Sequence, residues 1–287
     1  MMQFKEFEKQ FIEKLESDLP NGYKTEIAVS KKTNNNCKGL VVIKDDSMVS
    51  PVINTEKLYA AYNNLYKTAS EVYENIVTTT KKRNQSNYAM IPKDYNILKE
   101  SLFIRVSSAE QNREFLSNHP HTIVGDLAIT YHICIKSKNE RILFPFSNSL
   151  LHSYGIDIET LHTDAITNAP KLFPVRYDDT FNRMTVITNQ EKTNGAACVF
   201  YPGMLEELAK SKGNYYLLPS SIHEFIIIEE KLFHNTDELI NMVKTINSDH
   251  NIISPEDILT NSVYHYDACK HIFKTYNKKK RFAATFI

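Results

Sequence analysis

The close succession of predicted strands in the C-terminal half of the chain constrains the fold most. Apolar and β-branched runs predict strands at 184–188, 196–201, 215–218 and 222–228, with one helix, 203–211, among them. Parallel neighbours need a crossover of about a dozen residues or more, usually a helix, between the two strands. Since most of these connections are shorter, we expect an α+β fold: a mixed, largely antiparallel sheet with helices packed mainly on one side.

The other segments fit this fold class. Phe4, Phe7 and Phe11 recur at helical spacing, so the sequence predicts a helix over 3–17. Asn235 and Ser254 each have an acidic residue three positions later, and both are predicted to begin helices. Further predicted elements are strands at 23–29, 39–43 and 102–106, two helical segments within 58–76, an apolar run at 123–135 and a helix from 157 to 168.

A polar, basic run between the two halves, TTTKKRNQ at 78–85, has no periodic pattern. We expect a single α+β domain over 1–275. The alternative is an internal boundary near 78–94, between an N-terminal part of helices and strands and a C-terminal sheet. Residues 276–287, with three lysines and an arginine at 278–281, are expected to be a basic, solvated and mobile tail.

Charge and composition exclude several partners. The 34 basic and 34 acidic residues cancel, so no overall field attracts nucleic acid or an anionic membrane. No segment has the length of an apolar membrane span, and the acidic residues near the N-terminus do not fit a signal peptide. The four cysteines are widely separated, which indicates reduced thiols. We therefore expect a cytoplasmic protein that binds neither membrane nor nucleic acid.

Known cofactor and metal motifs are missing. With only seven glycines, the chain has neither a P-loop nor a G-x-G-x-x-G fingerprint, so we expect no cofactor. His119 and His121 are one residue apart, and His132 joins them if the chain folds back. This pattern is a weak zinc signal without the spacing of H-E-x-x-H. We interpret these histidines as ordinary surface residues and expect no metal site.

The segment from Pro219 to Glu224 concentrates polar groups at the start of a very apolar strand. If that strand begins at Ile222, His223 and Glu224 point to opposite faces, and one of them lies beside apolar neighbours. Such a group needs a hydrogen-bond partner, and we expect its pKa to shift toward neutrality. We expect a structural network in which Ser220 and Ser221 cap the turn and His223 ties two strands together.

A hydrolase is the alternative interpretation of the same residues. His223 is then the general base, Asp126 or Glu224 orients it, and the nucleophile is Cys198 or Ser221. No G-x-S-x-G elbow and no papain-like signature accompanies them. For a binding role, the candidate residues are Asn189, Gly195, Ser220 and His223.

Several segments carry a resemblance to a known family. They are MTVITN at 184–189, NGAACVFYP at 194–202, LLPSSIHEFIII at 217–228, SPEDIL at 254–259, VYHYD at 263–267 and, more weakly, HTIVGDLAITY at 121–131. In these the chain resembles the domain of unknown function family 5688, proteins of similar length from low-GC Gram-positive bacteria. The resemblance implies an intracellular bacterial protein carried on a mobile element or prophage. It implies no reaction, cofactor or catalytic residue.

We expect the chain to be a protein-binding module, an accessory of a mobile element or an anti-defence factor that engages a host or rival protein. The expectation comes from the lack of any known catalytic motif. Its partner is then another protein or a second copy of the chain. The hydrolase centred on His223 stays open as the alternative.

Overall fold

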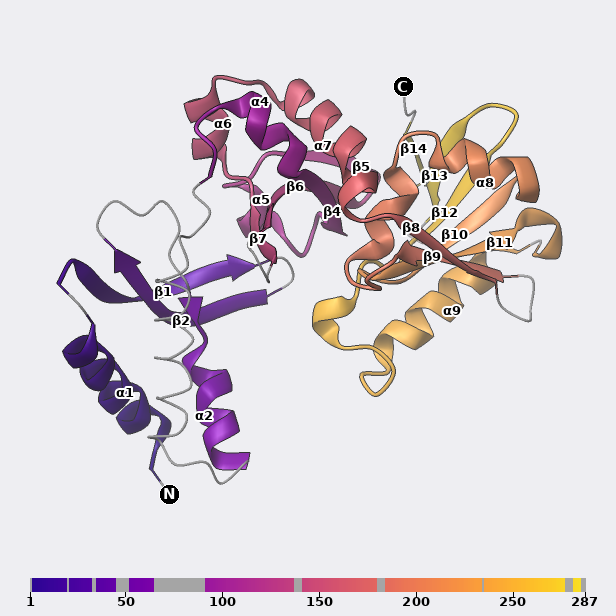
Figure 1. Ribbon diagram of the computed structural model, residues 1–287. Helices are drawn as coiled ribbons and strands as arrows, with labels where there is room; N and C mark the ends of the chain where they lie inside the picture. Colours follow the sequence, from indigo (N-terminus) through magenta and orange to yellow (C-terminus); the bar gives the residue numbers. More distant parts are fainter. Residues whose placement is uncertain are drawn as a thin grey trace. The chain divides into compact units, whose positions relative to one another are not determined.

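The computed structural model describes residues 2–19, 21–32, 35–44, 52–64, 91–136, 141–179, 184–233, 235–276 and 281–284. The chain divides into two compact units, 1–90 and 91–287, and each is described by itself. The described strands form three sheets, in which every pairing is antiparallel. Together with the helices these sheets confirm the predicted α+β fold (Figure 1).

In the first unit, the residues that the structure describes form a small sheet with two helices. Its described elements, in chain order, are α1 (Phe4–Asp18), β1 (Tyr23–Lys32), β2 (Asn35–Lys44), β3 (Val52–Ile53) and α2 (Thr55–Asn64). The apolar stripe of α1 buries Phe11 and Leu15 against Leu40 and Val42 of β2. The predicted helix at 3–17 and the predicted strand pair are therefore confirmed. The predicted connection at 78–94 and the end of the helical region before it fall largely outside the described residues.

The second unit begins with a four-stranded sheet. Strands β4 (Leu102–Ser108) and β5 (His121–Val124) flank β6 (Leu127–Lys136), and β7 (Arg141–Pro145) pairs with the far part of β6. Helix α7 (Ile158–Leu172) packs on β4 and β6. The other helices of this part are α4 (Tyr95–Leu98), the 3₁₀ turn η1 (Lys99–Ser101), α5 (Arg113–Leu116) and α6 (Asn148–Tyr154).

A seven-stranded sheet forms the rest of this unit. Its strands lie in the order β14-β13-β12-β10-β11-β9-β8. Helix α9 (Thr236–Ser248) packs on β10 and β12, where Leu239, Ile240 and Val243 meet a cluster that includes Tyr216 and Leu218. The remaining bounds are β8 (Val175–Asp179), β9 (Met184–Asn189), α8 (Met204–Lys212), β10 (Tyr215–Ser221), β11 (Glu224–Glu229), η3 (Glu230–Leu232), β12 (Val263–Asp267), β13 (Ile272–Tyr276) and β14 (Arg281–Ala284).

One predicted strand is a helix. The run predicted as a strand at 196–201 forms the 3₁₀ helix η2 (Gly195–Phe200), and all six of its residues are buried. A short run that is apolar on every side has no period from which strand and helix can be distinguished. Asn194 enters η2 with a φ of 54°, so the chain turns sharply where the prediction had it run straight into a strand.

Several boundaries also differ from the prediction, among them the end of β10, which runs through Pro219 to Ser221 and not to 218. Strand β11 begins at Glu224 and not at Ile222, because the chain turns at 222–223 after a register shift between Pro219 and Ser221. The helix predicted from Ser254 is a single 3₁₀ turn, η4 (Pro255–Asp257). Within the expected mobile tail, residues 281–284 are ordered as β14, which pairs with β13.

Candidate functional site

His223 lies in the turn between β10 and β11, where its imidazole joins two other segments. Its Nδ1 accepts a hydrogen bond from the backbone N–H of Asn194, at 3.0 Å. Its Nε2 lies 3.3 Å from Oδ1 of Asp257, in η4. The side chain is about one third exposed, at 33%. The imidazole thus connects the β10–β11 turn to the entry of η2 and to η4.

Backbone and hydroxyl groups fix the same turn. The Oγ of Ser221 accepts from the N–H of His223 at 3.0 Å, and the hydroxyl of Thr188 donates to the carbonyl of His223 at 2.8 Å. The N–H of Ile222 donates to the carbonyl of Asp257 at 2.8 Å. Local side-chain bonds thus satisfy the backbone groups of the turn, with Ser221 as one of the predicted caps. The imidazole of His223 does not tie two strands together as expected, because its partners lie at the entry of η2 and in η4.

Gly195 sits where no larger residue fits. A Cβ at this position would lie 2.3 Å from Oγ1 of Thr188, 2.5 Å from the backbone N of Asn189 and 2.7 Å from the carbonyl oxygen of His223. Two of these three atoms belong to the backbone and cannot move aside. Gly195 therefore lets the start of η2 pack directly on the His223 turn.

The hydrogen bonds of His223 determine its tautomer. Because Nδ1 accepts the N–H of Asn194, the ring proton of the neutral imidazole is assigned to Nε2, where it points to Asp257. The lone pair of Nδ1 is then engaged with Asn194 and Nε2 carries the proton, so neither nitrogen has a free lone pair with which to take a proton from a substrate. A general base needs such a lone pair within hydrogen-bond reach of its substrate.

Asp126, a candidate to orient His223, makes its hydrogen bonds with other residues. It lies in the β5–β6 turn, and its carboxylate accepts hydroxyl bonds from Thr260 at 2.6 Å, Ser262 at 2.6 Å and Tyr264 at 2.5 Å. We call these four residues the Asp126 clamp. The clamp joins the four-stranded sheet to the segment that leads into β12 of the large sheet.

Cys198 lies in η2 and is fully buried. Burial raises the pKa of its thiol to about 12, since the protein interior disfavours the charged thiolate. A thiol with this pKa is almost entirely protonated near neutral pH and is therefore a poor nucleophile. Of the other candidates, Ser221 bonds to the backbone of His223, and Ser220 and Glu224 are half-buried on either side of the turn.

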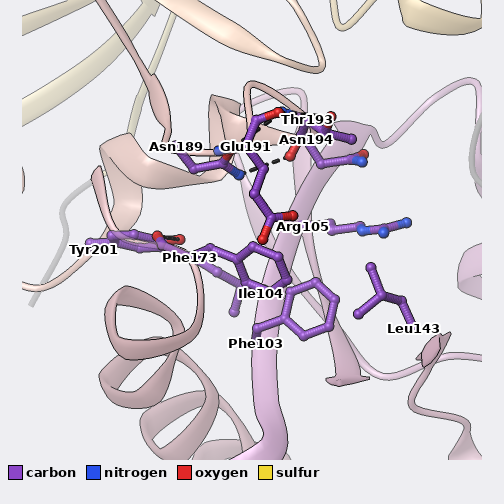
Figure 2. A pocket seen from close by; sticks show the side chains of 10 residues that line it. All are labelled: Phe103, Ile104, Arg105, Leu143, Phe173, Asn189, Glu191, Thr193, Asn194 and Tyr201. Carbon is purple, nitrogen blue, oxygen red and sulfur yellow. Dashed lines mark hydrogen bonds between the residues drawn. The ribbon is translucent and has the colours of Figure 1, made fainter. Parts of the chain in front are cut away.

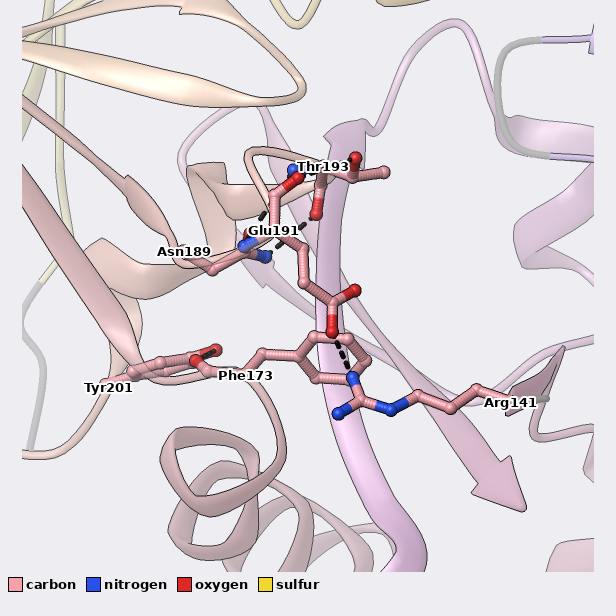
Figure 3. Close-up of polar contacts among 6 residues, drawn as sticks. All are labelled: Arg141, Phe173, Asn189, Glu191, Thr193 and Tyr201. Atoms are coloured by element: carbon pink, nitrogen blue, oxygen red, sulfur yellow. Dashed lines mark hydrogen bonds and ion pairs between the residues drawn. The ribbon is translucent and has the colours of Figure 1, made fainter. Parts of the chain in front are cut away.

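The loop between β9 and η2 connects the His223 turn to a pocket. Asn189 holds this loop: its side-chain amide donates to the carbonyl of Thr193 at 2.8 Å, and its carbonyl accepts from the N–H groups of Glu191 and Thr193 (Figure 3). Asn194 closes the loop through its bond to His223. Asn189, Gly195 and His223 are thus brought together, with Asn189 on the pocket side.

The pocket has a volume of about 30 Å³ and lies between this loop and the four-stranded sheet (Figure 2). It contains two charged side chains, Arg105 of β4 and Glu191. Glu191 forms an ion pair with Arg141 of β7 (Figure 3). The full lining consists of Phe103, Ile104, Arg105, Leu143, Phe173, Asn189, Glu191, Thr193, Asn194 and Tyr201. Pockets for drug-sized ligands hold roughly 300–1,000 Å³, so this one has room only for a small group.

The sequence interpretation missed Asp257, Asn194 and Arg105. Asp257 was identified only as a first-turn residue of a predicted helix, and Asn194 contributes a backbone N–H that no side-chain pattern reveals. Arg105 had a weak signal, because it is a charged residue inside an otherwise apolar strand.

Over the residues that the structure covers, no group of three or more His, Cys, Asp or Glu side chains could hold a metal ion. His119 and His121 instead contact backbone carbonyls, and His132 contacts the hydroxyl of Thr130. The interpretation as surface residues is wrong for His132, which lies in β6 and is buried. Within the same residues, no helix combines the length and the apolar character needed to cross a membrane.

The comparisons with known proteins agree with the resemblance seen in the sequence. The chain matches the family of unknown function DUF5688 over residues 4–180 and 176–268. No curated protein matches it, and no solved structure does. Since the two matched segments cover most of the chain, it belongs to the family DUF5688.

Proposed function

We propose that this protein is a cytoplasmic protein-binding module whose docking surface is the outer side of α9. The observation that carries the proposal is an apolar stripe on α9 that is wider than the area the sheet covers. Leu239 and Val243 are buried on the sheet, whereas Met242 and Ile246 are 44% and 37% exposed. Residues three and four apart are neighbours on a helix, so these four side chains form one continuous stripe.

The turn after the helix extends the exposed apolar character. Ile252, four residues beyond the end of α9, is 67% exposed. Single exposed apolar residues are common, but three of them on one helix and its following turn mark a surface that favours contact with another protein. Methionine is enriched in such interfaces, where its flexible side chain adapts to the partner. The partner we propose is a protein that offers an apolar groove to the helix.

Nothing in the described geometry favours the hydrolase. Both nitrogens of His223 are engaged, the thiol of Cys198 is buried and protonated, and Asp126 is tied to three hydroxyls. The free thiols of Cys134, Cys198 and Cys269 support the proposal of a reducing, cytoplasmic location. The expectation of a mobile-element accessory or an anti-defence factor stays a prediction, and it names the class of partner to look for.

The test compares the wild-type protein with Met242→Gln/Ile246→Gln. Tagged forms are expressed in a bacterial host, crosslinked in the cells and purified, and the co-purified proteins are quantified. Since anchors of an interface each contribute more than about 1 kcal/mol, we expect recovery of the partner to fall about tenfold or more in the double variant. The free energy of unfolding changes little, because both side chains are exposed.

The matched control is Asn241→Gln, an exposed residue of α9 on the side away from the stripe. It keeps the helix and leaves recovery at the wild-type level. Sedimentation of purified protein determines whether the partner is a second copy of the chain. The proposal is wrong if the double variant recovers the same proteins in the same amounts as the wild type, or if the wild type is purified without any partner.

A further inference from the structure

Arg105 is a positive charge on an otherwise apolar strand, and its side chain is half-buried. It lies in the middle of β4, opposite Thr130 of β6, and Thr130 in turn lies opposite His121 of β5. Side chains alternate between the two faces of a strand, so Arg105 shares its face with Phe103 and with Leu143 of β7. The neighbouring strand residues Ile104 and Val106 are buried.

No acidic side chain pairs with this guanidinium among the residues that the structure describes. Its Nε is buried and has no hydrogen-bond partner there. Glu191 carries the only carboxylate in the lining of the pocket, and this carboxylate is already paired with Arg141. Burial alone lowers the pKa of Arg105, with no carboxylate to raise it again. The pocket therefore has one positive charge that is not neutralised.

Partial burial of a charge also has a cost unless the charge is paired and hydrogen-bonded, and arginine remains charged at any physiological pH. The ring of Phe103 lies 5.6 Å from the guanidinium carbon and stabilises the cation only partly. Asn194 lines the same pocket, and Figure 2 shows its side-chain amide and the guanidinium of Arg105 on one side of the pocket. An anion in this place has donors from both groups.

We propose that this pocket binds a carboxylate group, held by the guanidinium of Arg105 and the amide of Asn194. The fork of N–H groups on arginine matches the two oxygens of a carboxylate. A single negative charge neutralises Arg105, whereas a doubly charged phosphate would leave an excess of negative charge beside Glu191. The apolar walls from Leu143 and Phe173 also suit the short apolar chain that leads to such a carboxylate.

The carboxylate can come from a free small acid or from an acidic side chain of a bound protein, and the proposal does not depend on the docking surface of α9. The experiment uses the full chain, with sodium propionate, sodium phosphate and a capped peptide of six glutamates as probes, each compared with sodium chloride at equal ionic strength. The readouts are the melting temperature and the NMR signal of the Arg105 Nε–H group.

We expect propionate to raise the melting temperature of the wild type and to shift the Nε–H signal of Arg105. Both effects saturate as the propionate concentration rises. In Arg105→Met the affinity for propionate falls about tenfold or more, since a charge-assisted bond is lost. In chloride alone the variant melts at or above the wild-type temperature, because an unpaired, partly buried charge has been removed. Arg113→Met, at an exposed arginine of α5 paired with Glu110, behaves like the wild type.

A response to the peptide but not to propionate assigns the carboxylate to a protein partner and leaves the site intact. The proposal is overturned if neither probe gives a shift that depends on Arg105. It is also overturned if phosphate stabilises the wild type more than either carboxylate does. If Arg105→Met does not fold, the titration of the Nε–H signal in the wild type decides between these outcomes.

Discussion

At the scale of single residues, the imidazole of His223 links its own turn to two other segments of the chain. In His223→Ala the N–H of Asn194 loses its acceptor and Asp257 loses its donor. Leaving such groups unsatisfied costs about 1–3 kcal/mol, and the partial exposure of this site places the loss near the lower end. We expect a free energy of unfolding about 1 kcal/mol below that of the wild type, measured by chemical denaturation.

The control for this change is His223→Asn, whose side-chain oxygen is able to accept a hydrogen bond at a similar position. We expect it to recover part of the lost stability, while recovery of the protein partner stays at the wild-type level in both variants. If His223→Ala keeps its full stability but no longer binds a partner, the turn is a binding site and not a structural network.

Gly195 gives a sharper prediction. In Gly195→Ala the new methyl group meets backbone atoms of Asn189 and His223 at less than 3 Å, so η2 has to shift. Overpacking of this kind costs about 1–3 kcal/mol. Thermal unfolding followed by circular dichroism measures the loss. Gly213→Ala is an informative comparison, because a Cβ there meets no atom and only its φ of 66° is strained.

The sequence was informative about which residues of this turn are polar and confined, but not about their partners. The segment from Pro219 to Glu224 was singled out because polar groups precede an apolar strand. Asn194 and Asp257 are 29 and 34 residues away from His223, and they reach it only after strand register and loop geometry are set. A single sequence contains no local signal for such contacts.

At the scale of elements, the Asp126 clamp connects the two sheets of the second unit. Three hydroxyls donate to one carboxylate, and such charge-assisted bonds are stronger than neutral ones. In Asp126→Asn a single carbonyl oxygen remains as acceptor, and the amide group faces hydroxyls. We expect a loss of at least about 2 kcal/mol in the free energy of unfolding, measured in urea.

Hydrogen exchange shows where that loss acts. In Asp126→Asn we expect faster exchange of the amides in β5 and in the segment from 260 to 264, while β1 and β2 in the first unit keep their rates. Glu110→Gln, which removes an exposed ion pair with Arg113, is the control and leaves all these rates unchanged. Unchanged protection at 260–264 in Asp126→Asn would show that the clamp does not stabilise the contact between the sheets.

Periodic elements were predictable, and fully buried ones were not. Helices α1 and α9 show an apolar stripe and, for α9, a cap: the side chain of Asn235 accepts from the N–H of Asp237. In contrast, η2 is apolar all round and was predicted as a strand. Whether such a run becomes helix or strand depends on tertiary packing, here the close approach of Gly195 to the His223 turn.

At the scale of the whole molecule, buried histidines link stability to pH. Burial holds the pKa of His132 well below its ordinary value, and the pKa values of His119, His162 and His265 are also lowered. A histidine with a lowered pKa in the folded state takes up its proton more readily when unfolded. Its contribution to stability is therefore complete above about pH 6.5 and is lost as the pH falls below that value.

We expect the second unit to lose stability between about pH 6.5 and 5, with a slope of up to about 1.4 kcal/mol per pH unit from His132 alone. Urea denaturation at several pH values measures the slope. His132→Gln keeps a hydrogen-bonding side chain beside Thr130 but does not titrate, so its slope is smaller. Equal slopes in the wild type and in His132→Gln would contradict this account.

The sequence separation within the Asp126 clamp determines when the second unit can fold during synthesis. Its hydroxyl donors follow Asp126 by 134, 136 and 138 residues. While the ribosome is still adding residues before Thr260, the carboxylate lacks every one of these partners, and β10 lacks its neighbour β12. The contact surface of the nascent four-stranded sheet for the large sheet therefore stays uncovered until residues 260–264 have left the exit tunnel.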